Sequence, residues 1–300
     1  MKKIRRFFRG LWRIISLPFR LLWWLVQLPF RAIKRAGIFL TEEPEDRPLT
    51  ETLATSFQQP ATLFEHIDAL RKHLLRMVLA LIFTIAVGAI FTEKIIDVLA
   101  RPIGGIKTLQ AIDITESVGT FMLVALVTGF VLALPYITFE LWLFIAPGLH
   151  ARTRQMGLLG IPLALIFFLG GVAFAYFLLL PSALPFLLNF MGIHTIPRVS
   201  SYVNFVTGLL FWIGLAFEFP LVIYVVTLMG LVKPQQLAKQ WRYAIVVIAI
   251  IAAAVTPTVD PVNMTLVMLP MIMLYFLSIG LSYLAVAGRK RELANQAQQG

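Results

Sequence analysis

Residues 117–146 read SVGTFMLVALVTGFVLALPYITFELWLFIA, and Glu140 is the single charged side chain among them. A helix needs about 20 apolar residues to cross the hydrocarbon core of a bilayer. This stretch is therefore predicted to be a transmembrane helix. Five further runs of the same kind lie at 74–92, 156–180, 200–229, 243–256 and 263–287. The run at 243–256 is short, and the last one carries Pro270.

The composition of the whole chain agrees with these runs. Of its 300 residues, 59% are apolar and only 14% are charged, and the mean hydropathy is +0.84. A soluble domain has about half its residues apolar and about a quarter charged, so a single water-soluble domain is excluded. A disordered chain is excluded too, because it needs few apolar residues. We predict an all-α, polytopic membrane protein with six transmembrane helices.

The basic residues predict the orientation of these helices. With both termini in the cytoplasm, 22 of the 26 Lys and Arg residues fall on the cytoplasmic side. Cytoplasmic loops carry an excess of Lys and Arg, so we expect both termini there and a location in the cytoplasmic membrane. The same bias accounts for most of the net charge of +11, and no nucleic-acid partner is expected.

Residues 1–40 form a separate, basic unit. Wound as a helix, they place Lys and Arg side chains on one narrow stripe and Phe, Leu, Ile and Trp around the rest. This pattern favours an amphipathic helix in the membrane interface, in contact with lipid. The alternative is a seventh span. It would place Arg20 near mid-bilayer, with an insertion cost of about 2.5–3.5 kcal/mol. An acidic, flexible linker is expected at 41–62, a six-helix domain at 63–288, and a cytoplasmic tail at 289–300.

The sequence shows no catalytic motif. The four His residues have no metalloprotease spacing, the chain has no Cys, and nucleotide-binding loops are absent. We predict a protein that is not an enzyme and holds no metal or cofactor. The membrane-embedded carboxylates are the candidates for function. An ionisable group such as Glu218 marks a pathway or a partner contact by default, whereas snorkelling to the interface is a sufficient explanation for Glu140.

A charged cluster at 64–76, FEHIDALRKHLLR, stands directly before the first span. It suits an amphipathic entry helix with self-paired charges, since Asp68 and Lys72 are four residues apart. It also suits an acidic surface that docks a basic peptide. Composition alone leaves both interpretations open.

Five motifs in colinear order resemble those of the TatC family, the multi-spanning subunit of the twin-arginine protein translocase. They are HIDALR at 66–71, WLFIAPGL at 142–149, GVAFAYF at 171–177 followed by Pro181, FEFP at 217–220, and VTPTVDP at 255–261. The resemblance runs from about residue 62 to 287. It marks as structural motif residues Pro147, Gly148, Leu149, Tyr176, Pro220, Pro257 and Asp260.

The resemblance implies the function and the partners. A TatC-like protein recognises twin-arginine signal peptides of folded cargo, recruits TatA- or TatB-like single-span subunits, and works in an oligomer driven by the proton-motive force. Signal-peptide binding is then expected from Glu65, His66, Asp68 and Arg71, and contacts with partners inside the membrane from Glu140 and Glu218.

The sequence departs from the family pattern at three acidic positions. Ala69 stands where the opening motif has a glutamate, Thr153 where the first cytoplasmic loop has an acid, and Phe276 where the sixth span has a glutamate. Two alternatives to a receptor therefore stay open. One is a divergent paralogue with a structural or regulatory role in the translocase. The other is a proton-coupled transporter of small solutes that uses Glu218, although the inverted repeats expected of one are absent.

Overall fold

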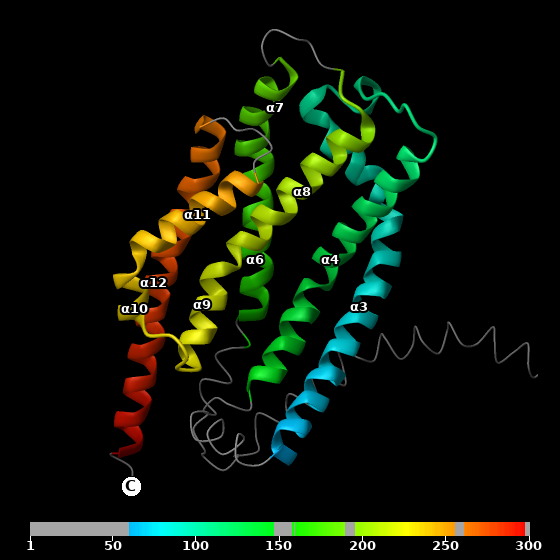
Figure 1. Ribbon diagram of the computed structural model, residues 1–300. Coiled ribbons are helices and arrows are strands. Elements are labelled where there is room, and N and C mark those ends of the chain that lie inside the picture. Colours follow the sequence, from blue (N-terminus) through cyan, green and yellow to red (C-terminus); the bar gives the residue numbers. More distant parts are fainter. Residues whose placement is uncertain (1–59, 147–157, 159, 190–195, 256–260, 298–300) are drawn as a thin grey trace, which may run out of the picture. The chain divides into compact units, whose positions relative to one another are not determined.

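The computed structural model describes residues 60–146, 158, 160–189, 196–255 and 261–297, where the backbone is almost entirely helical (Figure 1). Within these ranges the side chains at 60–66, 255, 262–263 and 288–297 are not part of the description. The described residues form no strand, only one isolated bridge between Gln110 and Arg198. The all-α prediction is confirmed. The predicted interfacial helix at 1–40 lies outside the described residues.

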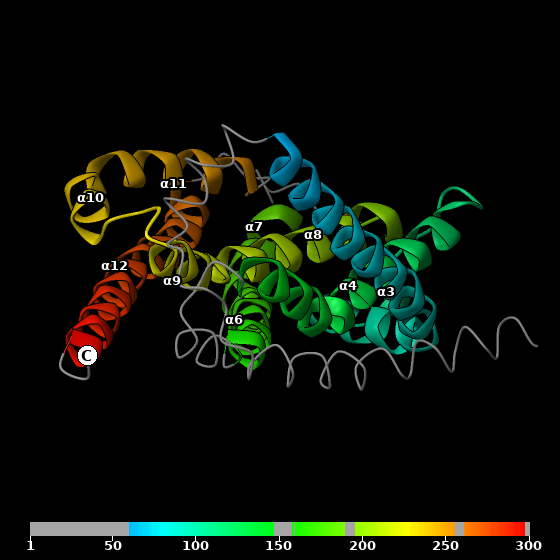
Figure 2. The same cartoon turned by 90° about the horizontal axis from the view of Figure 1, so that it is seen from below.

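The described part of the chain contains helices of very different lengths. In chain order they are α3 (Pro60–Ala100), α4 (Glu116–Ile145), α6 (Gly160–Phe174), α7 (Leu180–Leu188), α8 (Val199–Phe217), α9 (Phe219–Leu228), α10 (Pro234–Lys239), α11 (Trp241–Val255) and α12 (Pro261–Ala297). A π-helical turn, η4 (Ala175–Leu179), joins α6 to α7. Seen from below, α10, α11 and α12 lie on one side and α3 and α4 on the other, with α6 and α8 between them (Figure 2).

Five helical segments among the described residues are long and apolar enough to cross a membrane. They are Ile67–Ile103, Glu116–Ile145, Gly160–Leu188, Val199–Leu228 and Met264–Ala287. The remaining candidate, α11, has 15 residues, which at 1.5 Å per residue makes about 22 Å. The hydrocarbon core is about 30 Å thick. The count of six spans therefore stays a prediction.

Two helices extend beyond the bounds expected for the six-helix domain, 63–288. Helix α3 already begins at Pro60, within the predicted linker, because Pro suits the first turn of a helix and no Gly or Pro follows before Gly88. Helix α12 continues to Ala297, through most of the predicted tail. The tail residues Arg289–Ala297 are mostly good helix formers, so nothing in them ends the helix.

Prolines reshape two of the spans. Pro181 would clash with the carbonyl four residues before it in a regular α-helix, and the π-helical turn η4 stands where that clash would fall. In the fourth span Pro220 lies in the first turn of α9, and Glu218 is the junction at which α8 ends and α9 begins. The predicted single helix at 200–229 is therefore two helices joined at Glu218.

Small residues let neighbouring helices approach closely. A Cβ atom added to Gly129 of α4 would lie 2.5 Å from the Cα of Ile85 in α3, and one added to Gly171 of α6 would lie 2.9 Å from the Cα of Gly214 in α8. Van der Waals packing of this kind drives helix association in membranes. The backbones of α3 and α4, which run side by side in Figure 1, therefore approach each other closely. The same holds for α6 and α8.

Polar contacts close the end of the protein where α3 ends and α4 and α8 begin. Glu116, which is 7% exposed, pairs with Arg198, and Gln110 exchanges backbone hydrogen bonds with the residues on either side of Arg198. The backbone N–H and the hydroxyl of Thr115 donate to Asp113 and hold the pKa of its carboxyl below the usual value. Hydrogen bonds and one ion pair therefore connect the segments at this end of the protein.

Candidate functional site

A buried carboxylate lies at the opposite end, where α3 begins and α4 ends. Glu140 is 2% exposed. Its Oε2 lies 2.5 Å from His73 Nδ1 and 3.5 Å from Arg76 Nη1, and its Oε1 accepts a hydrogen bond of 2.7 Å from the Tyr136 hydroxyl. We call these four residues the Glu140 cluster. The ring of His73 also packs edge-on against Phe144, with 6.0 Å between centroids.

Helix geometry explains how this cluster assembles. Residues three or four apart share a face of a helix, so Tyr136 and Glu140 share one face of α4, and His73 and Arg76 share one face of α3. The two helices are antiparallel neighbours, which brings the first turns of α3 to the last turns of α4. Four polar side chains that the sequence separates therefore meet at one point.

The expectation that Glu140 snorkels to the interface is wrong. The carboxylate points into the α3–α4 contact and not toward solvent, because Tyr136, His73 and Arg76 contact it there. A buried charge is tolerated only when it is paired and hydrogen-bonded. Glu140 meets that condition with partners from its own chain, so it links α3 to α4.

The residues expected to bind a signal peptide lie on the first turns of α3. Asp68 is exposed and pairs with Lys72 at 2.6 Å, with 53% of its side chain accessible, as the self-paired interpretation predicts. Arg71 is exposed. The backbone of Glu65 and His66 is helical, but their side chains are outside the description. The signal-peptide role of all four residues stays a prediction.

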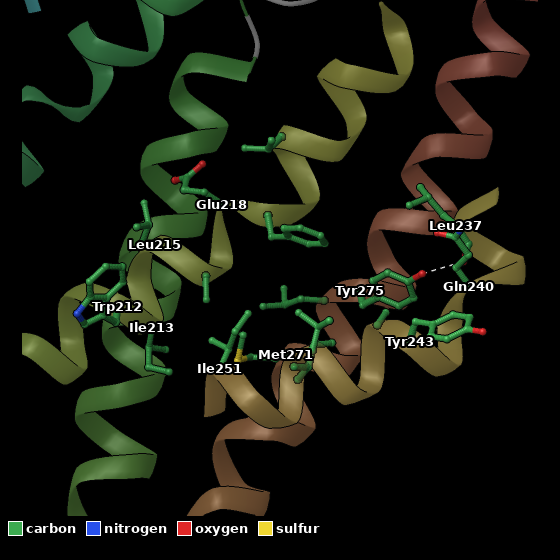
Figure 3. A pocket seen from close by; sticks show the side chains of 17 residues that line it. Trp212, Ile213, Leu215, Glu218, Leu237, Gln240, Tyr243, Ile251, Met271 and Tyr275 are labelled. Carbon is green, nitrogen blue, oxygen red and sulfur yellow. Dashed lines mark hydrogen bonds between the residues drawn. The ribbon is translucent and has the colours of Figure 1, made fainter. Parts of the chain in front are cut away.

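A second candidate site is a cavity of about 600 Å³ bounded by α8, α9, α10, α11 and α12. Figure 3 shows Trp212, Leu215 and Glu218 along one side of it, Tyr275 and Tyr243 across from them, and apolar side chains between. Glu218 is the sole acid in this lining. Its Oε1 is buried and has no hydrogen-bond partner among the described residues.

An unpaired carboxyl oxygen in an apolar cavity is costly unless a partner satisfies it, because burial removes its water. Across the cavity the Tyr275 hydroxyl is already committed, since it donates to the Leu237 carbonyl oxygen at 2.7 Å. The mostly apolar lining therefore holds one acidic group, Glu218, together with the polar atoms of Trp212, Gln240 and Tyr243. The structure places Glu218 inside a span, as the sequence predicts, and also at the junction of α8 and α9, which the sequence did not predict.

Two of the expected motif residues hold defined positions. Tyr176, in the π-helical turn, donates its hydroxyl to the Val98 carbonyl oxygen at 2.8 Å, and Pro220 is buried in the first turn of α9. Phe276, at the position of a family glutamate, is 49% exposed on α12. The remaining motif residues and Thr153 lie outside the described residues: Pro147, Gly148, Leu149, Pro257 and Asp260.

Sequence reasoning missed three members of the Glu140 cluster: His73, Arg76 and Tyr136. His73 and Arg76 belong to the charged cluster at 64–76, and the sequence does not distinguish them from the exposed charged residues of that cluster. The spacing of Tyr136 to Glu140, four residues on a helix, was the signal available. Which face of α3 meets it depends on the packing of the two helices.

The fold and these polar sites define an all-helical, multi-spanning membrane protein. Among the described residues no group of three or more His, Asp or Glu side chains could hold a metal ion. Two carboxyl groups stand out in the described part of the chain: Glu140, buried and partnered at an end of the helices, and Glu218, whose Oε1 has no hydrogen-bond partner, at a cavity within the spans.

Comparisons with known proteins identify the family. The family model for the Sec-independent protein translocase protein (TatC) matches residues 65–270. TatC of Carboxydothermus hydrogenoformans is 34% identical over 224 residues, which cover 74% of this chain and 92% of that protein. TatC of Aquifex aeolicus is 32% identical over 237 residues, which cover 76% of this chain and 97% of that protein. The chain belongs to the TatC family, and the expectation drawn from its five motifs is confirmed.

Solved structures agree with this assignment. The chain matches a crystal structure of the twin-arginine translocase receptor TatC with a TM-score of 0.63 and 30% identity. The match covers 74% of this chain and 99% of that chain. The protein is therefore a multi-pass membrane protein and a subunit of the Sec-independent, twin-arginine protein translocase.

Proposed function

We propose that this protein is the receptor subunit of the twin-arginine translocase: it binds twin-arginine signal peptides and organises the transport of folded proteins. The observation that carries the proposal is the match over 99% of a chain described as the TatC receptor. In this role the protein is not an enzyme. It holds no cofactor, and the proton-motive force drives the transport.

The charge pattern supports the orientation that this role needs. With the beginning of α3 and the end of α12 in the cytoplasm, 22 of 26 basic residues lie on that side, as the positive-inside rule expects. The Glu140 cluster and the first turns of α3 then face the compartment in which folded cargo arrives. The Glu116–Arg198 pair lies at the outer surface.

The cavity at Glu218 supports the proposed partners. TatA- and TatB-like subunits have a single transmembrane helix, and a helix that docks from the lipid would cover the exposed apolar side chains of Trp212 and Val222. A hydrogen-bond donor on that helix would satisfy Glu218 Oε1. Interhelical hydrogen bonds of this kind contribute about 0.6–2 kcal/mol.

One observation favours a second function. Ala69, Thr153 and Phe276 replace acids of the family pattern, which suits a paralogue that assembles with another TatC-like subunit without reading the arginine pair itself. Complementation separates the two functions. In a strain that lacks TatC, a receptor restores export of a twin-arginine reporter, whereas a structural paralogue does not.

Binding provides the direct test. The purified full-length chain, reconstituted in nanodiscs, is titrated with a fluorescent precursor whose signal carries Arg-Arg, and with a matched precursor that carries Lys-Lys. A receptor binds the Arg-Arg precursor at least about tenfold more tightly, because guanidinium groups bind carboxylates bidentately and ammonium groups do not. Equal affinities contradict the proposed receptor function.

A further inference from the structure

Glu140 has the properties of a binding carboxylate, in addition to linking α3 and α4. We propose that it receives the guanidinium of one arginine of the signal peptide, in exchange for Arg76. This inference rests on the proposed function and assigns a residue to it.

Glu140 is the strongest acidic candidate at its end of the protein. Among the side chains that the structure describes, Asp68 is the other acid there, and it is exposed and already paired with Lys72 at 2.6 Å. An exposed ion pair of this kind contributes little free energy, and salt screens the attraction between its charges. The remaining described acids lie at the far end or inside the spans: Glu93, Asp97, Asp113, Glu116 and Glu218.

The contact with Arg76 is the weakest in the Glu140 cluster. Tyr136 and His73 bind the carboxylate at 2.7 and 2.5 Å, whereas Arg76 reaches it through one nitrogen at 3.5 Å. Arginine and carboxylate groups commonly form two bonds of about 2.7–2.9 Å. A better-placed guanidinium would therefore displace that of Arg76. With 31% of its side chain accessible, Arg76 has a route to water.

The surroundings of Glu140 favour arginine over lysine. The carboxylate is 2% exposed, so a ligand cation must shed its water to reach it. A guanidinium is more weakly hydrated than an ammonium group and offers a planar fork that matches a carboxylate. Tyr136 and His73 hold that carboxylate in one orientation, which lowers the loss of freedom on binding.

The approach to Glu140 follows the contact between α3 and α4. Ala69, His73 and Arg76 share the face of α3 that meets α4, and all three are partly buried, whereas the residues between them are mostly exposed. In an extended peptide successive side chains point to opposite sides. Only one of two adjacent arginines can then enter this contact, so the two arginines of the motif should differ in their dependence on Glu140.

The test is a set of double-mutant cycles between receptor and signal. Wild-type chain and Glu140→Gln, each full length in nanodiscs, are titrated with precursors that carry Arg-Arg, Lys-Arg, Arg-Lys or Lys-Lys. We expect Glu140→Gln to weaken binding of the Arg-Arg precursor about tenfold or more and to change that of Lys-Lys less than about twofold. Coupling should appear for one arginine position and not for the other.

Glu116→Gln is the matched control, because it removes a buried, arginine-paired carboxylate at the far end of the protein. Its affinities should equal those of wild type. The inference is overturned if Glu140→Gln weakens all four precursors equally, if neither arginine couples to it, or if Glu116→Gln has the same effect. If wild type does not distinguish Arg-Arg from Lys-Lys, the proposed function itself fails.

A second variant covers the case in which Glu140→Gln does not fold. Arg76→Gln removes the competing guanidinium and leaves Tyr136 and His73 on the carboxylate. Because no displacement is then needed, we expect the Arg-Arg precursor to bind more tightly than to wild type. Unchanged or weaker binding of that precursor overturns the inference.

Discussion

Replacement of Gly129 by Ala should separate α3 from α4. The added Cβ would lie 2.5 Å from Ile85 Cα and 2.6 Å from Ile85 N. These are backbone atoms, so no side-chain rotation relieves the clash. The shortest contact must lengthen to the 3.4 Å at which ordinary van der Waals contact begins, and the helices must move apart along this contact.

The magnitude follows from two opposing effects. Overpacking of a close contact destabilises by about 1–3 kcal/mol, and a clash with backbone belongs in the upper half of that range. Ala in place of Gly within a helix stabilises by about 0.5–1 kcal/mol. The net loss for Gly129→Ala is therefore about 1–2.5 kcal/mol. Gly119, on the same helix, has no heavy atom near the added Cβ, so Gly119→Ala should be neutral or stabilising.

The measurement is the free energy of unfolding in SDS titrations of mixed micelles, followed by tryptophan fluorescence. Gly88→Ala should fall between the other two variants, because its closest contacts to the added Cβ are 3.0 Å. Gly129→Ala as stable as Gly119→Ala would refute the close α3–α4 approach. The Glu140 cluster depends on that approach, so its geometry would be refuted with it.

Three further outcomes are expected. Tyr202→Phe should destabilise by about 1–2 kcal/mol in the same SDS titration, since it removes a buried hydrogen bond to the last turn of α3; Tyr176→Phe removes an exposed one and should have a smaller effect. Thr227 and Ser282 join α9 to α12 through a buried hydrogen bond of 2.8 Å, so a Thr227→Val and Ser282→Ala cycle should show a coupling of about 0.6 kcal/mol; additive effects contradict that contact. Deletion of residues 1–40 should weaken binding to vesicles with anionic lipid, measured by co-sedimentation against neutral vesicles, because each basic residue near such a surface contributes about 1 kcal/mol.

The packing of the helices decided the role of Glu140. Its sequence context, near the end of an apolar run and two residues before Trp142, suits snorkelling to the interface equally well. The carboxylate is buried because α3 presents His73 and Arg76 to it, 67 and 64 positions earlier in the chain. The choice between the two environments therefore needs the register of α3 against α4, which a single sequence does not contain.

Glu218 shows the opposite case. An acid inside an apolar run predicts a polar site within the membrane, and the structure has one. The break between α8 and α9 at Glu218 was not predicted. The cavity beside it was not predictable. It is lined by α8, α9, α10, α11 and α12, and only their arrangement leaves that space open.

The sequence by itself determined the class of protein, because long uncharged runs have one stable environment and the positions of Lys and Arg favour one orientation. Its five ordered motifs were enough to indicate the family. The tertiary structure decided which polar groups meet. Hydropathy acts on each segment separately, whereas hydrogen bonds and ion pairs depend on distances of a few ångströms between segments far apart in the chain.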